Sequence, residues 1–126
     1  MSNLKRLEVK YVRDRAKSRY KKGEDCEICG TTEELQFHHF YTVDLLWNQW
    51  KKLHGIIIKD VDDIMAVRDD FIAEHEQELY EETATLCKHC HNNRLHRIYG
   101  QKPSLATAEK QKRWLLKQRE KFYGKD

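Results

Sequence analysis

The hydrophobic pattern changes period along the chain, and each period predicts a kind of element. Apolar residues recur at three- and four-residue steps over residues 3–22, which predicts an amphipathic helix that ends near Gly23. Over residues 34–40 apolar and polar residues alternate through Leu35 and Phe37, as in a half-buried strand. The chain is therefore expected to begin with a helix followed by a strand.

The remainder of the chain predicts further helices and one more strand. Residues 42–79 contain no proline and one glycine, and their apolar residues recur at helical spacing. Ser104, just after the single proline, is expected to be the N-cap of the last helix. In chain order, the predicted elements are helices over residues 43–54 and 60–79, a strand over residues 80–86, and helices over residues 91–99 and 104–123.

Length and composition predict one domain over residues 1–126, and the predicted mixture of helices and strands makes its class α+β. Charged residues make up 36% of the chain and apolar residues 39%. No apolar run approaches the roughly 18 residues that would cross a bilayer, and the first residues lack the apolar stretch of a signal peptide. We therefore expect a soluble, cytoplasmic protein with no membrane partner.

Charge is divided steeply along the chain. Residues 1–23 carry nine basic and two acidic side chains, whereas residues 24–86 carry four basic and sixteen acidic ones. Residues 101–126 are basic again, with eight basic and three acidic side chains. Basic ends predict a surface that faces a polyanion, although two solvated helices are the alternative. The acidic segment 60–82 is a candidate surface for a protein partner.

The four cysteines occur only as two Cys-x-x-Cys pairs, which are Cys26 with Cys29 and Cys87 with Cys90. In a reducing compartment this spacing favours a metal over disulfides, and four thiolates form a closed structural zinc site. Gly30, just after the second cysteine, permits the tight turn that such a knuckle needs. The alternative is a redox dithiol, but neither pair begins a thioredoxin-like helix.

Four of the seven histidines surround this cysteine framework, as His38, His39, His91 and His96. Neutral imidazoles that converge from a strand end and a helix start can hold a second divalent ion and leave positions open for water and phosphate oxygen. Neighbouring residues of a strand point to opposite faces, so His38 and His39 suit different roles. A ring that does not bind the ion can reach an attacking water.

The spacing of these residues resembles the HNH endonucleases with the ββα-metal motif, a treble-clef-like core with zinc knuckles. The resemblance lies in Cys26-x-x-Cys29, in Leu35-Gln36-Phe37-His38-His39, and in Leu86-Cys87-x-x-Cys90-His91 followed by His96. It places the core at residues 24–41 and 80–100, with a helical insertion at residues 42–79 and basic helices at both ends.

The resemblance implies a metal-dependent endonuclease or nickase that hydrolyses DNA and leaves 5′-phosphates. It implies that the four cysteines bind structural Zn²⁺, and that His38, His91 and His96 bind a catalytic Mg²⁺, Mn²⁺ or similar ion. His39 would be the general base that draws a proton from water. Small HNH proteins with basic arms also resemble nucleases of bacteriophages and mobile elements, which would act in the host cell cytoplasm.

Two positions depart from the family pattern. Glu82 stands where the family usually has an asparagine, and a carboxylate can also hold the tautomer of His39. One alternative is that Asn48, in the insertion, has this role, and the other is that the role is lost.

The second departure is that His91 and His96 are five residues apart rather than four. Five residues of an α-helix turn through about 500°, so both rings meet one ion only if the helix starts after His91 or bulges. Asn92 and Asn93 are the substitute ligands.

Other side chains have candidate roles in binding DNA. Arg94 and Arg97 follow His91 and could hold phosphate, because guanidinium pairs with phosphate oxygens in a bidentate way. Trp47, Trp50 and Trp114 could stack on bases, but aromatic residues at helical spacing usually belong to a core. Besides a nuclease, the sequence leaves open a zinc-stabilised nucleic-acid-binding module without catalysis, and a partner-binding protein.

Overall fold

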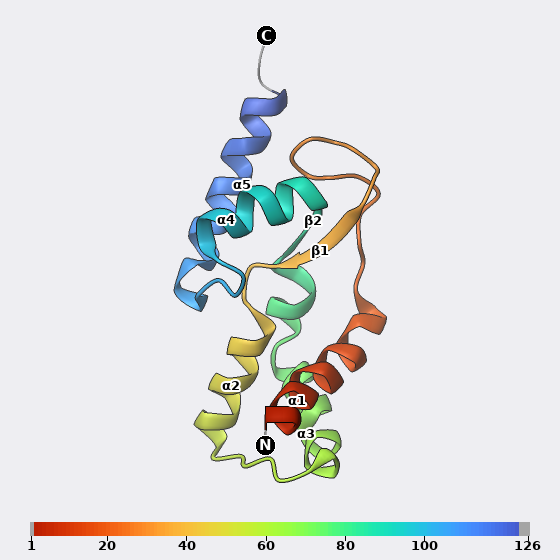
Figure 1. The fold of residues 1–126 in the computed structure, drawn as a ribbon, viewed down its shortest axis with the longest axis vertical. Coiled ribbons are helices and arrows are strands. Elements are labelled where there is room, and N and C mark those ends of the chain that lie inside the picture. The colour runs from red at the N-terminus through yellow and green to blue at the C-terminus, as the bar shows by residue number, and fades with distance from the viewer. Residues whose placement is uncertain (1, 124–126) are drawn as a thin grey trace.

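The structure is a computed structural model that describes residues 2–123, and its elements confirm the α+β class (Figure 1). None of the helices in this range is long and apolar enough to cross a membrane. In chain order, the elements are α1 (Ser2–Ala16), the 3-10 turn η1 (Lys17–Arg19), β1 (Leu35–His39), α2 (Val43–His54), α3 (Val61–Glu74), the π-helix η2 (Gln77–Glu81), β2 (Thr83–Cys87), the π-helix η3 (His89–Leu95), α4 (His96–Tyr99), the 3-10 turn η4 (Leu105–Thr107) and α5 (Ala108–Tyr123).

The two strands form an antiparallel ribbon that joins the two candidate sites. Leu35 lies opposite Cys87 at one end of the ribbon, and His39 lies opposite Thr83 at the other. The chain then continues from β2 into η3 and α4. This arrangement puts a cysteine knuckle at one end of the ribbon and the histidine pair at the other.

One hydrophobic cluster lies among α1, α2 and α3, in the lower half of Figure 1. Trp47 and Phe71 are fully buried there, and their rings meet edge to face with centroids 5.2 Å apart. Trp50 is also buried and packs beside them. Trp47 and Trp50 are therefore core residues and are not available to stack on bases.

A second cluster packs the cysteines and the sheet against η3 and α5. Ile28, Leu86 and Leu95 are fully buried at its centre, and half-buried Trp114 packs against it. Tyr41, in the connection between β1 and α2, contacts both clusters. The short segment around Tyr41 therefore links the half of the protein that contains the cysteines to its helical half.

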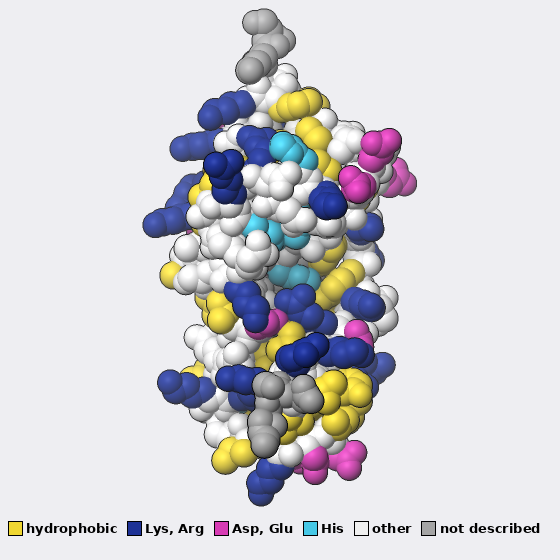
Figure 2. Space-filling model, in the orientation of Figure 1, with side chains coloured by type: hydrophobic (Ala, Val, Ile, Leu, Met, Phe, Trp, Pro, Cys, Tyr) yellow, Lys and Arg dark blue, Asp and Glu magenta, His cyan; other side chains and the backbone are white. Residues whose placement is uncertain are grey.

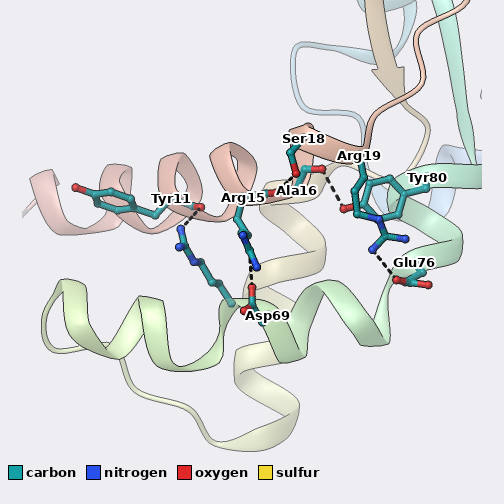
Figure 3. Close-up of polar contacts among 9 residues, drawn as sticks. Tyr11, Arg15, Ala16, Ser18, Arg19, Asp69, Glu76 and Tyr80 are labelled. Carbon is teal, nitrogen blue, oxygen red and sulfur yellow. Dashed lines mark hydrogen bonds and ion pairs between the residues drawn. The ribbon is translucent and has the colours of Figure 1, made fainter.

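Ion pairs join the basic N-terminal segment, residues 1–23, to the acidic segment 60–82 (Figure 3). Arg15 donates from Nε to Asp69 at 3.0 Å, and Arg19, just beyond α1, donates to Glu76 at 2.7 Å. Part of the basic N-terminal surface is thus paired within the chain, and so is part of the acidic segment 60–82. Neither surface is available as a whole to an outside partner.

Several predicted boundaries are wrong, and the helix predicted over residues 60–79 shows why. It ends at Glu74, because His75 leaves helical geometry at φ −126° and its Nδ1 hydrogen-bonds to the Phe71 carbonyl at 2.8 Å. The chain continues as η2, so that β2 starts at Thr83 instead of residue 80. The first helix likewise ends at Ala16 and a 3-10 turn, earlier than residue 22. The helix over 43–54 is confirmed at both ends.

Candidate metal centres

The four cysteines come together as the sequence predicts. Their sulfur atoms all lie within 4.8 Å of one another, and the Sγ atoms of Cys29 and Cys87 are 3.7 Å apart. A tetrahedral zinc site with Zn–S bonds of about 2.3 Å requires sulfur atoms about 3.8 Å apart. The cluster could therefore hold a zinc ion.

The backbone around the first knuckle stabilises the thiolate form of one cysteine, Cys26. Gly30 has φ +77°, in the left-handed region, and its N–H donates to the Cys26 carbonyl at 2.9 Å. Burial alone would raise the pKa of Cys26, but hydrogen bonds from the backbone of Cys29, Cys87 and Ile28 lower it to about 7. The tight turn predicted at Gly30 thus delivers N–H groups to sulfur.

His38, His91 and His96 form a second cluster at the other end of the ribbon. His91 Nε2 lies 3.0 Å from His38 Nδ1 and 3.0 Å from His96 Nε2. The three rings border a pocket of about 140 Å³, which Arg13 and His39 also line. Figure 2 shows histidine side chains near the middle of the face that is turned to the viewer, with Lys and Arg side chains above and below them.

The π-helix η3 resolves the five-residue spacing of His91 and His96. The His96 N–H donates to the His91 carbonyl, which is the i to i+5 hydrogen bond of a π-turn. This bond places residues five apart one above the other, so both rings reach the same point. Asn92 and Asn93, the substitute ligands considered above, are exposed on the helix.

Hydrogen bonds fix which nitrogen of each ring faces the cluster. Gln111 donates through its amide nitrogen to the Phe40 carbonyl at 3.2 Å, which turns its oxygen toward His38 Nε2 at 2.8 Å. His38 Nε2 therefore carries the proton, and Nδ1 keeps its lone pair.

The other two rings are fixed in the same way. His91 Nδ1 lies 2.7 Å from the Gln36 side-chain oxygen, and His96 Nδ1 lies 2.6 Å from the Gly100 carbonyl. Both Nδ1 atoms are donors, because these oxygens only accept. Three unprotonated nitrogens therefore converge on one point.

Burial keeps the imidazoles of His38 and His91 neutral. It lowers the pKa of His38 to about 3, against a hydrogen bond with Gln111 that raises it, and the charges of His91 and His96 lower it further. Burial also lowers the pKa of His91 to about 4, again with a contribution from His96. Neutral imidazole is the form that binds metal.

His39 lies on the opposite face of β1 from His38. Its Nε2 donates to the Leu79 carbonyl at 3.0 Å, so Nδ1 keeps the lone pair. The rings of Tyr20 and Phe37 meet it edge-on, with centroids 4.9 and 5.2 Å away. Burial lowers the pKa of His39 to about 4, the Leu79 carbonyl raises it, and the charge of Arg13 lowers it further.

Glu82, which the sequence suggested as the residue that orients His39, bonds to other side chains. Its carboxylate pairs with Lys112 of α5 and accepts from Gln77 at 3.3 Å, whereas His39 Nε2 donates to the Leu79 carbonyl. Asn48, the alternative, is exposed on α2. A backbone carbonyl thus performs the orienting task that the sequence suggested for a side chain.

The two candidate arginines differ in their surroundings. Arg94 hydrogen-bonds to Gln118 of α5 and lies over the Trp114 ring, 5.6 Å from its centroid. Arg97 is exposed on α4. Neither lines the histidine pocket.

Three side chains at the site were missed by sequence reasoning. Gln111 lies on the apolar face of the last helix with Ala108 and Leu115, and a buried polar residue on such a face is a signal. Gln36 is two residues before His38, hence on the same face of the strand. Arg13 comes from α1, and nothing local in the sequence connects it with the histidines.

A four-cysteine cluster and three convergent imidazoles beside a pocket define a small protein with two candidate metal centres. A family model described as the nicking endonuclease family, that of phage T5, matches residues 1–126. The chain belongs to this family, and membership supports an endonuclease, a phosphodiester hydrolase that acts on DNA. No solved structure matches the chain.

Proposed function

We propose that the protein is an HNH-type nicking endonuclease, in which His38, His91 and His96 hold a catalytic divalent ion and His39 is the general base. In this proposal β1, β2 and the helical segment η3–α4 are the ββα-metal core, and the four cysteines hold a structural zinc ion. The basic helices α1 and α5 bind DNA at its phosphates, through basic side chains that do not pair with α3.

The observation that carries the proposal is the convergence of three unprotonated ring nitrogens. His91 Nε2 lies 3.0 Å from His38 Nδ1 and 3.0 Å from His96 Nε2, and the lone pairs of these nitrogens repel one another unless a cation lies between them. Burial opposes protonation of His38 and His91, so a proton is a poor candidate for that cation. A divalent metal ion fits the donor set, and a phosphodiester can approach it through the pocket.

The chain's own groups account for the proton transfer. His39 Nδ1 is free to take a proton from water, which then attacks the phosphorus in line with the leaving 3′ oxygen. The Leu79 carbonyl holds the Nε2–H tautomer and stabilises the imidazolium that forms. A divalent ion in the site would stabilise charge on the phosphate and on the leaving oxygen.

Plasmid nicking tests this function. Supercoiled plasmid is incubated with the protein and Mg²⁺ or Mn²⁺, and conversion to the open circle is followed on a gel. The parent should nick only with metal, and His39→Ala should lose about 10²- to 10⁴-fold in rate, as expected for a general base. His54→Ala, on exposed α2 surface, is the matched control. Absence of metal-dependent nicking by the parent would refute the proposal, and equal rates would exclude His39 as the base.

A further inference from the structure

A charged cluster lies at the edge of the histidine pocket. It separates this pocket from a larger groove that runs along α1 and α2. Arg13 of α1 donates through Nη2 to Asp44 of α2 at 3.1 Å, and Lys102 donates to the second oxygen of the same carboxylate at 2.7 Å. Arg13 lines the histidine pocket, whereas Asp44 and Lys102 line the groove. The cluster therefore joins three segments at the mouth of the candidate active site.

Asp44 is well held in this cluster. Its side chain is 12% exposed, and it lies in the first turn of α2, where the helix dipole favours a negative charge. Burial alone would raise its pKa, but the hydrogen bond from Lys102 and the charge of Arg13 lower it. The carboxylate is thus a fixed anion that can hold a guanidinium in one orientation.

Arg13 has donors to spare. A guanidinium carries five N–H donors in a planar fork, and the contact with Asp44 uses Nη2. Its side chain is 51% exposed, so the remaining donors are accessible at the pocket. Because Lys102 already neutralises Asp44, the carboxylate alone does not account for the presence of an arginine here.

The charge of the pocket favours an anion. Among the described residues that line it, Arg13 carries the one formal charge and there is no carboxylate. Three neutral imidazoles leave the charge of a bound divalent ion intact. An arginine next to such an ion matches a phosphodiester, whose two non-bridging oxygens accept hydrogen bonds from guanidinium.

We propose that Arg13 binds the scissile phosphodiester in the histidine pocket through its free N–H donors, and that Asp44 is the positioning residue that holds Arg13 there. This inference rests on the proposed function. It assigns a catalytic group, Arg13, to α1, a helix outside the HNH-like core. Lys102 then balances the charge of Asp44 while Arg13 also donates to the phosphate.

The first experiment measures single-turnover nicking by Arg13→Ala, Arg13→Lys and Arg15→Ala. Arg15 is a matched control, because it lies on the same helix and pairs with Asp69 on the far side of α1. Arg13→Ala should nick about 10²-fold or more slowly, the loss typical of one donor to a developing anion. Lysine should restore part of the rate, and millimolar ethylguanidinium should rescue Arg13→Ala. Arg15→Ala should nick like the parent.

The second experiment tests the positioning role of Asp44. Asp44→Asn keeps the shape of the side chain and removes its charge, so it should slow nicking less than Arg13→Ala does. The double variant should be no slower than Arg13→Ala alone, because a residue that acts through Arg13 has no effect once Arg13 is gone. Additive losses in rate would overturn this role, and a thermal melt of each variant separates it from loss of folding.

A binding measurement separates failure of this inference from failure of the proposed function. In a His39→Ala background, fluorescence anisotropy with a short duplex should show weaker binding by Arg13→Ala, with a salt slope smaller by about one. If the parent nicks and Arg13→Ala matches it without rescue, the inference fails while the nuclease stands. If the parent never nicks, the function fails, and Arg13 is supported or rejected by the salt slope alone.

Discussion

The replacement of Gln111 by leucine tests whether the hydrogen bonds behind His38 set its metal-binding nitrogen. Gln111 is fully buried and makes three hydrogen bonds, to His38 at 2.8 Å, to the Phe40 carbonyl at 3.2 Å and to Thr107 at 3.0 Å. Leucine fills a similar volume but removes the amide. His38 Nε2 then loses its acceptor, and nothing favours the tautomer that presents Nδ1 to the metal.

The size of the effect follows from these contacts. Three lost hydrogen bonds at about 1 kcal/mol each, partly offset by the buried leucine, should lower the free energy of unfolding by about 2 kcal/mol. Metal affinity at the histidine cluster should fall by about 10- to 100-fold, as for other groups that orient a metal-binding histidine. The rate at saturating metal should fall less than the affinity.

The assay is a titration of nicking rate against Mn²⁺, with urea unfolding on the same samples. Gln118→Leu is the control, since it makes the same substitution on α5 at a residue that contacts Arg94 instead of a histidine. It should leave the half-saturating Mn²⁺ concentration unchanged. An unchanged half-saturation in a folded Gln111→Leu variant would refute the tautomer argument.

Three further predictions concern the metals and the helical core. Cys87→Ser should release zinc, measured with a chromogenic chelator, and abolish the cooperative thermal melt, because structural zinc contributes folding energy outright. A cooperative melt that survives loss of the metal would contradict a structural role for the zinc ion. Nicking should reach half its maximum at a lower concentration of Mn²⁺ than of Mg²⁺, since three imidazoles converge on the site and no carboxylate lines the described pocket. Equal or lower half-saturation with Mg²⁺ would count against a three-histidine site. Lys51→Met should lower the free energy of unfolding in urea by about 3 kcal/mol, because it leaves the buried Glu8 carboxylate without its cationic partner. The variant Lys52→Met, at the exposed neighbouring residue, should change this free energy little. Similar values for both variants would refute a stabilising role for the buried Lys51–Glu8 ion pair.

Short-range spacing predicted the parts of the site that depend on local geometry. Two Cys-x-x-Cys knuckles each bring two sulfurs together, and adjacent residues of a strand separate His38 from His39. The five-residue gap between His91 and His96 required a bulge or a late helix start if both rings were to meet one ion, and a π-helix occurs there. In each case the relevant atoms belong to one turn or one strand.

The rest of the site depends on packing between distant segments. Glu82 was a reasonable partner for His39 by sequence position, but Lys112 of α5 takes its carboxylate, and the Leu79 carbonyl reaches His39 from η2. Arg13 and Gln111 arrive from opposite ends of the chain. No periodicity within one element specifies such contacts, because they arise only when α1 packs against α2 and α3, and α5 packs against the sheet.

The π-turn of η3 has a consequence for how this site tolerates insertions. A π-turn accommodates one residue more than an α-turn, so a helix with histidines four apart could gain one residue between them and still present both rings to one ion. Conversely, deletion of Asn92 or Asn93 would return the pair to α-helical spacing. The convergence of the two rings thus depends on the hydrogen-bond register of the helix more than on a fixed number of residues between them.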